Sequence, residues 1–540
     1  MASHLHFEMR NASLQYVDPY DFWASGDPVP MGYRDQNHTV HGPFVLDYRS
    51  IRQKWLDLDG KPGSPLDDDG KGIILGQKAN DPLSYFRKQH FEHGVIVFES
   101  GWGTDYYPYT ETYLPDVRAA DADVPDWHSM IVVRNNGDYS ATVNVTFYTD
   151  DGRVLDSRTH TSVPARGVWT LNVHDALLDF LNQAEYHGVF EGSAIVYASH
   201  DVSVVVKTIG PQEVTGYGGL HATSAFGFSA PGSRLYAPYV FKHSYPDAPW
   251  HSVLRVQNTG TAPSQVRVRY RGLNGLSQPS WVIIKEIAPG AAATFDPDEM
   301  GDIPSDWLGS GFITSLDGQP LAAQPLAAVV ETRSERGDEP ERRTTYLAPS
   351  RGGTAINLPL ILREYYGFTT GFQVLNTTGD PATITAVRYY NTAGEEVWAR
   401  TNIPLPARGA ATFDQAEDPL GELFVGSVRI EASRAVVVAV NQAHSGHLYA
   451  LDYTGFDGGG QVLRLPIADY NYPGGWWSGF TVQNVSGGTP TVTVRYYDTG
   501  GTQVDSESKT LGAYEAWSPP PAPLGFNGSA VVEATQDVAV

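Results

Sequence analysis

Two short acidic segments near the start of the chain carry residue types that can hold a metal ion. Both place aspartates two residues apart on a turn that ends in glycine, in the stretches 57–60 and 67–70. Such carboxylates can bind Ca²⁺, although a full calcium loop has further ligands at alternate positions and a distant glutamate, which neither stretch supplies. Two solvated acidic turns would give the same pattern. The sequence therefore predicts either no cofactor or Ca²⁺, and the predicted ligands are Asp57, Asp59, Asp67 and Asp69.

The sequence contains no local motif for catalysis. A Gly-x-Ser-x-Gly elbow, a His-Glu-x-x-His pair, a P-loop and a dinucleotide-binding glycine motif are all missing, and the chain has no cysteine. A catalytic triad can still be assembled from residues far apart in the sequence. Against this, four copies of one scaffold, described below, are a poor setting for a unique active site. We predict that the protein is not an enzyme and has no catalytic residue.

Several asparagines could accept N-linked glycans. The Asn-x-Ser/Thr sequences begin at Asn11, Asn37, Asn144, Asn376, Asn484 and Asn527. Asn376 and Asn484 fall at the same position of an internal repeat, where a strand meets a turn. Glycans there would suit an exposed surface, but asparagine also favours turns through its own hydrogen bonding. We predict glycosylation at Asn144, Asn376 and Asn484.

A pattern that recurs four times organises the chain from residue 111 onward. Each copy opens with an apolar residue and a proline, and these prolines are 123, 121 and 107 residues apart: Pro115, Pro238, Pro359 and Pro466. An alternating strand then ends at an asparagine: Asn135, Asn258, Asn376 and Asn484. Self-similarity at a nearly fixed period predicts one structural unit built four times.

The residue pattern within each copy predicts β structure. Apolar and polar residues alternate over strand-length runs, and Gly, Asn and Pro separate the runs. Such alternation is typical of antiparallel sheets with one packed face and one wet face. About seven short strands per copy fit a sandwich of two sheets, and a short helix is expected over 175–186. The predicted fold class is all-β, with tandem antiparallel, Ig-like β-sandwich repeats after an N-terminal module.

Five domains follow from these boundaries. Residues 1–110 do not fit the repeat and are predicted to form the N-terminal module. The four sandwiches are assigned to residues 111–232, 233–353, 354–461 and 462–540. The last one is predicted to be incomplete, because the first three copies continue into a further candidate strand whereas the fourth stops at Val540.

The charge balance limits the partners. With 37 Lys and Arg against 61 Asp and Glu, the chain carries a formal charge of −24 at pH 7, which repels nucleic acid and anionic lipid. No apolar run approaches the roughly 20 residues of a membrane-spanning helix, and the first four residues lack the features of a secretory signal. We expect no nucleic acid partner and no membrane span, and the route of export stays open.

A spaced set of aromatic and glycine residues marks the N-terminal module. Its members are Ile51, Trp55, Gly60, Gly63-Ser64-Pro65, Leu75-Gly76, Phe91-Glu92-His93-Gly94-Val95-Ile96 and Gly101. This set resembles the short LGFP-type repeats of secreted, wall-associated bacterial proteins, which have Phe-Pro where this chain has Gln77-Lys78. The four later copies resemble the repeated sandwich modules of bacterial cell-surface proteins in general. Both resemblances imply an extracellular surface role, and neither implies a catalytic residue.

The predicted gap in the fourth sandwich suggests a mode of assembly. An open sheet edge is a template for strand addition, and Leu5, Phe7 and Met9 alternate as a donor strand would. We predict that this segment of one copy pairs with the last sandwich of the next copy, near Val538 and Val540. Such a contact does not close on itself and would produce a filament. A chain that is a fragment of a longer repeat protein would explain the gap equally well.

The predicted function is that of an extracellular structural protein at the cell surface, as a subunit of a filament, layer or sheath. Its main partner would be further copies of itself, and cell-wall or surface glycans are the second class of partner. One alternative is an adhesin or carbohydrate-binding surface protein that uses loops at the ends of the sandwiches. The other alternative is the non-catalytic region of a secreted hydrolase.

Overall fold

A computed structural model describes residues 111–540 except 121–126, 184–187, 211–221, 245–248, 319–320, 335–341, 446–449 and 473–475, together with eight strands before residue 111. This part of the chain is almost entirely antiparallel β structure, so the predicted all-β class of tandem sandwiches is confirmed. The expected helix exists as α3 (Val173–Leu181). It begins earlier than expected because the Asn172 side chain caps it, accepting a hydrogen bond from the His174 N–H. No described helix has the length and apolarity needed to cross a membrane.

The first repeat has the arrangement on which all four copies are based. Its strands are β9 (Thr112–Ala120), β10 (His128–Asn135), β11 (Ala141–Tyr148), β12 (Val154–Val163), β13 (Val168–Asn172), β14 (Val189–Ala198), β15 (Val202–Ile209) and β16 (Ala222–Phe226). One sheet has the order β12-β11-β14-β9 and the other the order β13-β10-β15-β16. The two four-stranded sheets pack face to face as a sandwich.

The second repeat matches the first strand for strand. Its strands are β17 (Arg234–Lys242), β18 (Trp250–Asn258), β19 (Ser264–Gly272), β20 (Val282–Ile287), β21 (Ala292–Phe295), β22 (Trp307–Ser315), β23 (Leu326–Ser334) and β24 (Arg342–Leu347). The sheet orders are β20-β19-β22-β17 and β21-β18-β23-β24. A short 3-10 helix, η1 (Pro297–Glu299), stands where the first repeat has α3.

In the third and fourth repeats one long strand runs through both sheets. These long strands are β30 (Phe424–His444) and β39 (Gly528–Ala539). The third repeat also has β25 (Gly353–Arg363), β26 (Phe368–Asn376), β27 (Ala382–Asn391), β28 (Glu396–Leu405), β29 (Ala410–Asp414) and β31 (Ala450–Thr454). The fourth has β32 (Gly460–Leu465), β33 (Tyr470–Tyr472), β34 (Trp476–Trp477), β35 (Val482–Asn484), β36 (Thr491–Asp498), β37 (Gln503–Thr510) and β38 (Ala516–Trp517). Among the described residues, this repeat contains no counterpart of β16, β24 and β31.

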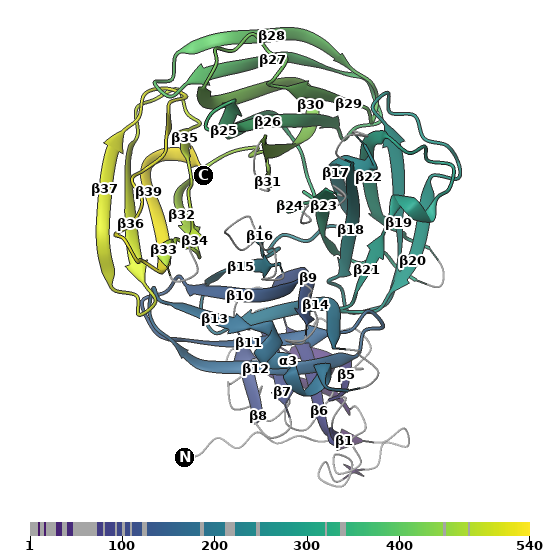
Figure 1. Ribbon diagram of the computed structural model, residues 1–540. Helices are drawn as coiled ribbons and strands as arrows, with labels where there is room; N and C mark the ends of the chain where they lie inside the picture. Colours follow the sequence, from purple (N-terminus) through teal and green to yellow (C-terminus); the bar gives the residue numbers. More distant parts are fainter. Residues whose placement is uncertain are drawn as a thin grey trace.

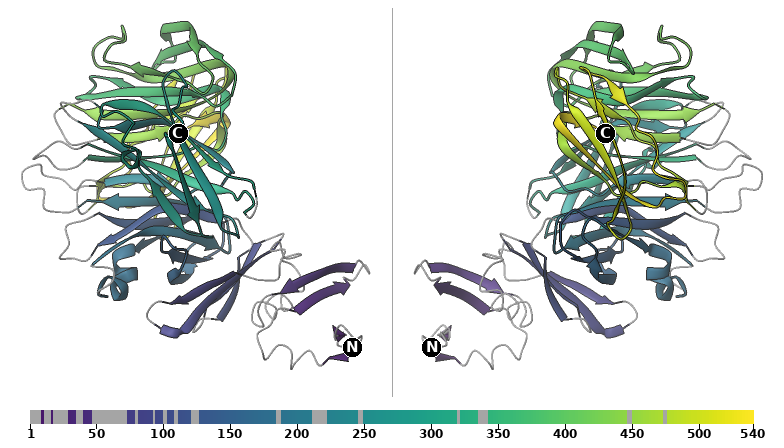
Figure 2. Two further views of the ribbon diagram at one scale, coloured as in Figure 1. Left: turned by 90° about the vertical axis from the view of Figure 1, so that its right-hand side faces the viewer. Right: turned by 90° about the vertical axis from the view of Figure 1, so that its left-hand side faces the viewer.

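Eight strands precede the repeats. They are β1 (Met9–Arg10), β2 (Tyr16–Val17), β3 (Val29–Arg34), β4 (Val40–Leu46), β5 (Ile73–Lys78), β6 (Asp81–Phe91), β7 (Gly94–Glu99) and β8 (Gly103–Tyr107). The last four form one antiparallel sheet, and β5 lies against β12 of the first repeat. Figure 2 shows that β5 to β8 stand to one side of the repeats.

The four repeats are arranged in a ring (Figure 1). The strands β12, β20, β28 and β37 lie on its outside, and β16, β24 and β31 lie nearest the centre. At the centre β24 lies against both β16 and β31. The fourth repeat lies beside the first, so the tandem array closes on itself rather than extending as a rod.

One turn-to-turn contact recurs at all four seams, where a seam is the contact between two neighbouring repeats. The hairpin turns after β11, β19, β27 and β36 meet, in the next repeat, the turns before β21, β29, β38 and β13 respectively. Each hairpin turn has a glycine with positive φ, and a Cβ atom there would overlap the next repeat: Gly152, Gly275, Gly394 and Gly501. At the closing seam the Val168 N–H donates to Thr499 O at 3.0 Å. The ring is therefore closed by the same contact that joins consecutive repeats.

The seams bury faces of the sheets that were expected to be wet. Along β14, Ala194 and Val196 belong to the core of the first repeat, whereas Ile195 and Tyr197 belong to a core shared with the second repeat. Successive residues of a strand point to opposite faces of the sheet. This sheet therefore packs on its partner sheet on one side and on the next repeat on the other, which corrects the expectation of one solvated face.

Candidate functional site

None of the side chains of the predicted calcium ligands and donor-strand residues is among the described ones. This group comprises Asp57, Asp59, Asp67, Asp69, Leu5, Phe7 and Met9. The backbone of Met9 belongs to β1, where it is in register with Val17. The calcium site and the strand exchange stay predictions.

The C-terminal residues of the predicted subunit contact are internal to the fourth repeat. Val538 is fully buried and pairs with Gly460 and Asn484. Val540 packs against the same core. These two side chains therefore stabilise their own sandwich.

The three predicted glycosylation sites are buried, which contradicts that prediction. Asn376 and Asn484 donate both Nδ2 hydrogens to carbonyl oxygens of the flanking turns at 2.7 to 2.9 Å. Asn144 donates to two hydroxyl groups of β12. A glycan on Nδ2 would remove one of these bonds and would have no path to solvent. Asn135 and Asn258 make the same turn contacts, so the recurring asparagine has a structural role.

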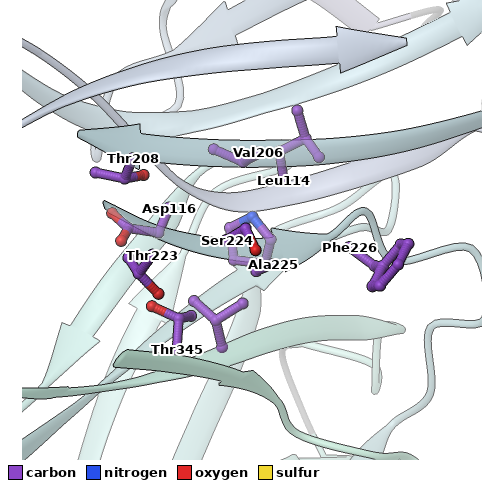
Figure 3. Close-up of a pocket in the computed structure, with 11 residues that line it drawn as sticks. Leu114, Asp116, Val206, Thr208, Thr223, Ser224, Ala225, Phe226 and Thr345 are labelled. Carbon is purple, nitrogen blue, oxygen red and sulfur yellow. The ribbon is translucent and has the colours of Figure 1, made fainter. Parts of the chain in front are cut away.

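A shallow pocket lies on the inner side of the first seam (Figure 3). It is lined by β9, β15 and β16 of the first repeat and by β23 and β24 of the second. The side chains of Thr208, Thr223, Ser224 and Thr345 bring hydroxyl groups, and Asp116 brings a carboxylate. The Phe226 side chain, at one end of the pocket, belongs to a residue that is 48% exposed. The cavity itself has a volume of only about 20 Å³, room for about one water molecule, and about 320 Å³ of empty space is reached only when the space open to solvent is included.

A buried network of charges joins the two repeats next to the pocket. Arg118 binds both oxygens of Asp116, at 3.0 and 3.1 Å, and lies 2.8 Å from Glu331 of the second repeat. Arg343 lies 3.4 Å from the same glutamate and stacks over the Trp127 ring. The side chains of Asp116, Arg118, Glu331 and Arg343 are at most 10% exposed. Removal of Arg118 would therefore take both guanidinium hydrogen bonds away from the buried Asp116 carboxylate.

The network fixes the charge of the pocket carboxylate. Burial raises the pKa of Asp116, but the charges of Arg118, Arg255 and Arg343 outweigh burial, so the pKa lies below its usual value. Asp116 is thus an ionised acceptor at neutral pH. A carboxylate and several hydroxyl groups can bind a ligand rich in hydroxyls, while an exposed aromatic ring can pack against its C–H groups. This combination suits a sugar.

One feature of the sequence indicates the buried charge network beside this pocket. Glu331 follows the apolar residues Ala327 to Val330 within β23, and a charge inside such a run predicts a buried ion pair. Its partner Arg118 lies in the preceding repeat, and no local pattern links the two residues. The hydroxyl groups of the pocket are individually unremarkable in the sequence, so only the folded chain shows that they converge.

A second polar contact lies at the seam between the second and third repeats. Asp452 on β31 accepts hydrogen bonds from Thr344 of the second repeat and, at 2.8 Å, from Asn441. Burial raises the pKa of Asp452 to about 6, and the hydrogen bonds from Thr344, Tyr239 and Asn441 only partly oppose this shift. Ionising Asp452 therefore costs the folded state more than the unfolded chain.

Asp452 should make this seam less stable as the pH rises. Its folded pKa exceeds its unfolded pKa, so its contribution is complete below about pH 4 and is lost as the pH rises through about 6. Between pH 4.5 and 7.5 the wild type should lose about 2 kcal/mol more unfolding free energy than the Asp452→Asn variant. Urea unfolding of both proteins at the two pH values measures this difference. Equal losses in the two proteins would show that Asp452 titrates normally.

Comparison with known proteins gives little further guidance. No family model and no curated protein matches the chain. A solved tetra-tandem repeat from the extending region of a large adhesion protein is similar over 79% of this chain and 99% of its own, with 13% identity and a TM-score of 0.09. Escherichia coli alpha-2-macroglobulin activated by porcine elastase is similar over 79% of this chain and 43% of its own, with 10% identity and a TM-score of 0.11. Scores this low carry no argument about fold or function.

Proposed function

We propose that the protein is a non-enzymatic, extracellular adhesion protein that binds glycans at the pocket of the first seam. The observation that supports this most is the chemistry of the pocket, where an exposed aromatic ring, hydroxyl groups and an ionised carboxylate converge. Small-molecule sites combine an apolar surface with a few well-placed polar groups in this way. The acidic chain and its resemblance to surface proteins fit the same role.

The hydrogen bonds around the pocket hold its polar side chains in place, which favours a preformed site over induced fit. Asp116 is held by two bonds from Arg118, and the hydroxyl group of Thr208 lies 3.1 Å from that of Ser129. Residues on paired strands of a closed ring have little freedom to move. Because the cavity is too small to enclose a sugar ring, a glycan would lie across its open face, with one hydroxyl group directed into it.

A glycan array followed by calorimetry tests the proposal. The wild type should bind one class of neutral glycan, because the hydroxyl groups of a sugar can donate to Asp116 and to the threonine and serine oxygens. Phe226→Ala should weaken this binding about five- to tenfold, as expected for the loss of roughly 1 to 1.5 kcal/mol of ring packing. Because Phe226 is exposed, the variant should stay folded.

The matched control is Tyr139→Ala, which removes an aromatic side chain from a residue that is 76% exposed in the β10–β11 turn of the same repeat. This variant should bind like the wild type. Equal weakening in the two variants, or an array without any binding to the wild type, would contradict the proposed site.

Assembly into a filament, layer or sheath remains a second proposal. It rests on the predicted strand exchange, while the ring closure uses contacts between repeats of one chain. Negative-stain microscopy separates the two proposals. Long regular polymers would support assembly, and isolated rings at high protein concentration would argue against it.

A further inference from the structure

One hydrogen bond sets the same local framework in every repeat. In the first three repeats a backbone N–H near the end of the first strand donates to a hydroxyl group on the second strand, and in the fourth repeat the donor lies just before β33 and the hydroxyl group just after β34. The four pairs are Arg118 with Ser129, Phe241 with Ser252, Leu362 with Thr370, and Asp469 with Ser478, at 3.0 to 3.1 Å. Residues at fixed offsets from these pairs therefore meet at the same place in each repeat.

A second recurring hydrogen bond fixes a third residue position beside these pairs. A side chain at the end of β13 or β29, or just after β21, accepts a hydrogen bond from the backbone N–H two residues later, which caps the following turn. The three described cases are Asn172 with His174, Asp296 with Asp298, and Asp414 with Ala416. The framework thus offers each of the first three repeats three positions whose side chains lie close together.

In the second repeat these positions hold His243, His251 and Asp298. Their ligating atoms all lie within 4.8 Å of one another. The two imidazole rings stack with centroids 4.7 Å apart, and His243 Nε2 lies 3.0 Å from Asp298. The first repeat has Ala120, His128 and His174 at the corresponding positions, and the third has Glu364, Thr369 and Ala416. Within the described residues, a cluster of metal-ligand types is found in the second repeat alone.

The environment of His251 points to a ligand. This side chain is fully buried, and its Nε2 lies 2.9 Å from Asp296. A carboxylate only accepts, so the Nε2–H donates and Nδ1 carries the lone pair. Nδ1 is buried and has no hydrogen-bond partner, which is costly for a polar atom unless something binds there. A histidine that donates its other ring N–H to a carboxylate is the usual arrangement around a metal ion.

We propose that His243, His251 and Asp298 bind a divalent transition-metal ion of the Zn²⁺ class, with Asp296 orienting His251. Two imidazole nitrogens and one carboxylate oxygen suit zinc, whereas Ca²⁺ takes oxygen ligands. Three protein ligands leave a fourth position for water or an external group. Small rotations of Asp298 and His243, whose side chains are 46% and 32% exposed, would close the ligand set around the ion.

A neighbouring cation limits the affinity of the site. Lys242 Nζ lies 3.5 Å from Asp298. Its ammonium group also donates to the carbonyl oxygens of Pro297 and Met300, at 3.3 and 3.0 Å. These carbonyl groups can retain the ammonium when Asp298 turns to a metal ion, so the lysine weakens metal binding without blocking it.

Titration of chelator-treated, full-length protein with ZnCl₂ tests the proposal, with Co²⁺ absorption as a second readout of ligand geometry. His243→Asn and Asp298→Asn should each weaken one Zn²⁺ site by at least tenfold. Asparagine tolerates the positive φ of 48° at residue 243, and Asp298 is half exposed, so both variants should fold. Thermal unfolding without metal should confirm this.

His128→Asn is the matched control, since this residue occupies the position of His251 in the first repeat, where alanine replaces His243. It should leave Zn²⁺ binding unchanged. Failure of the wild type to bind Zn²⁺, or equal binding by the wild type and the His243 and Asp298 variants, would overturn the proposal. Zn²⁺ bound elsewhere, for example by histidines before residue 111, would give the second of these outcomes.

Discussion

Replacing Gly501 by alanine should open the ring at the seam between the fourth and first repeats. Gly501 has a φ of +85°, and a Cβ atom there would overlap the carbonyl oxygen of Ala165. Strain in the left-handed region and the overlap together should cost about 3 kcal/mol or more. Small-angle scattering should show a larger radius of gyration, and urea unfolding should show the loss of stability.

Gly525→Ala is the matched control for this substitution. Gly525 has nearly the same φ, +83°, but a Cβ atom there would meet nothing within 4 Å. Alanine at this position should cost only the backbone strain of about 1 kcal/mol and leave the radius of gyration unchanged. Equal destabilisation of the two variants, with no change in size, would mean that the closing seam contributes little.

Ring closure changes the number of interfaces that stabilise each repeat. In an open array the terminal repeats each have one neighbour, and stability is approximately a sum of repeat and interface terms. Here the first repeat contacts the second through Arg118 and Glu331 and contacts the fourth through Val168 and Thr499. Every repeat therefore has two neighbours, so the opening of one seam should weaken the repeats on both sides of it.

The sandwiches could be predicted from the sequence because residues close together in the chain define the strands and turns of each one. Alternation of apolar residues and regular turns define the strands of one repeat. The ring could not be predicted in the same way, because glycines such as Gly152 and Gly501 look like ordinary hairpin residues. One clue was present in β14, where residues 194–198 are all apolar. A continuous apolar run indicates a strand buried on both faces, and both faces of this strand are indeed covered.

The candidate sites were harder to predict than the fold. The recurring asparagine was visible, but its role in the turn and its role as a glycan acceptor produce the same sequence pattern. His251 and Asp298 are separated by three strands and several turns, so no motif spacing relates them. Both the zinc ligands and the pocket depend on how strands of a sandwich, or of two sandwiches, lie beside one another. Such proximity follows from tertiary structure and leaves no periodic signal.

Arg118→Met should destabilise the first seam by about 3 to 5 kcal/mol, the usual cost of removing one partner from a buried ion pair. Asp116 would lose both of its bonds to the guanidinium, and Glu331 would lose its contact at 2.8 Å. Urea unfolding measures the effect. Arg388→Ala is the control, because it breaks a pair with Glu396 whose side chains are 36% and 41% exposed. The loss there should be below about 1 kcal/mol.

A double substitution separates two causes of the lost stability, which are the unpaired charge of Asp116 and the lost packing of the Arg118 side chain. If the cost of Arg118→Met comes mainly from leaving Asp116 buried and unpaired, then Arg118→Met with Asp116→Asn should be more stable than Arg118→Met alone. The two substitutions should thus be strongly non-additive, by more than about 1 kcal/mol. Simple additivity would mean that the network acts through the volume of Arg118 rather than its charge. In that case the charge of Asp116 would contribute little to the stability of the seam.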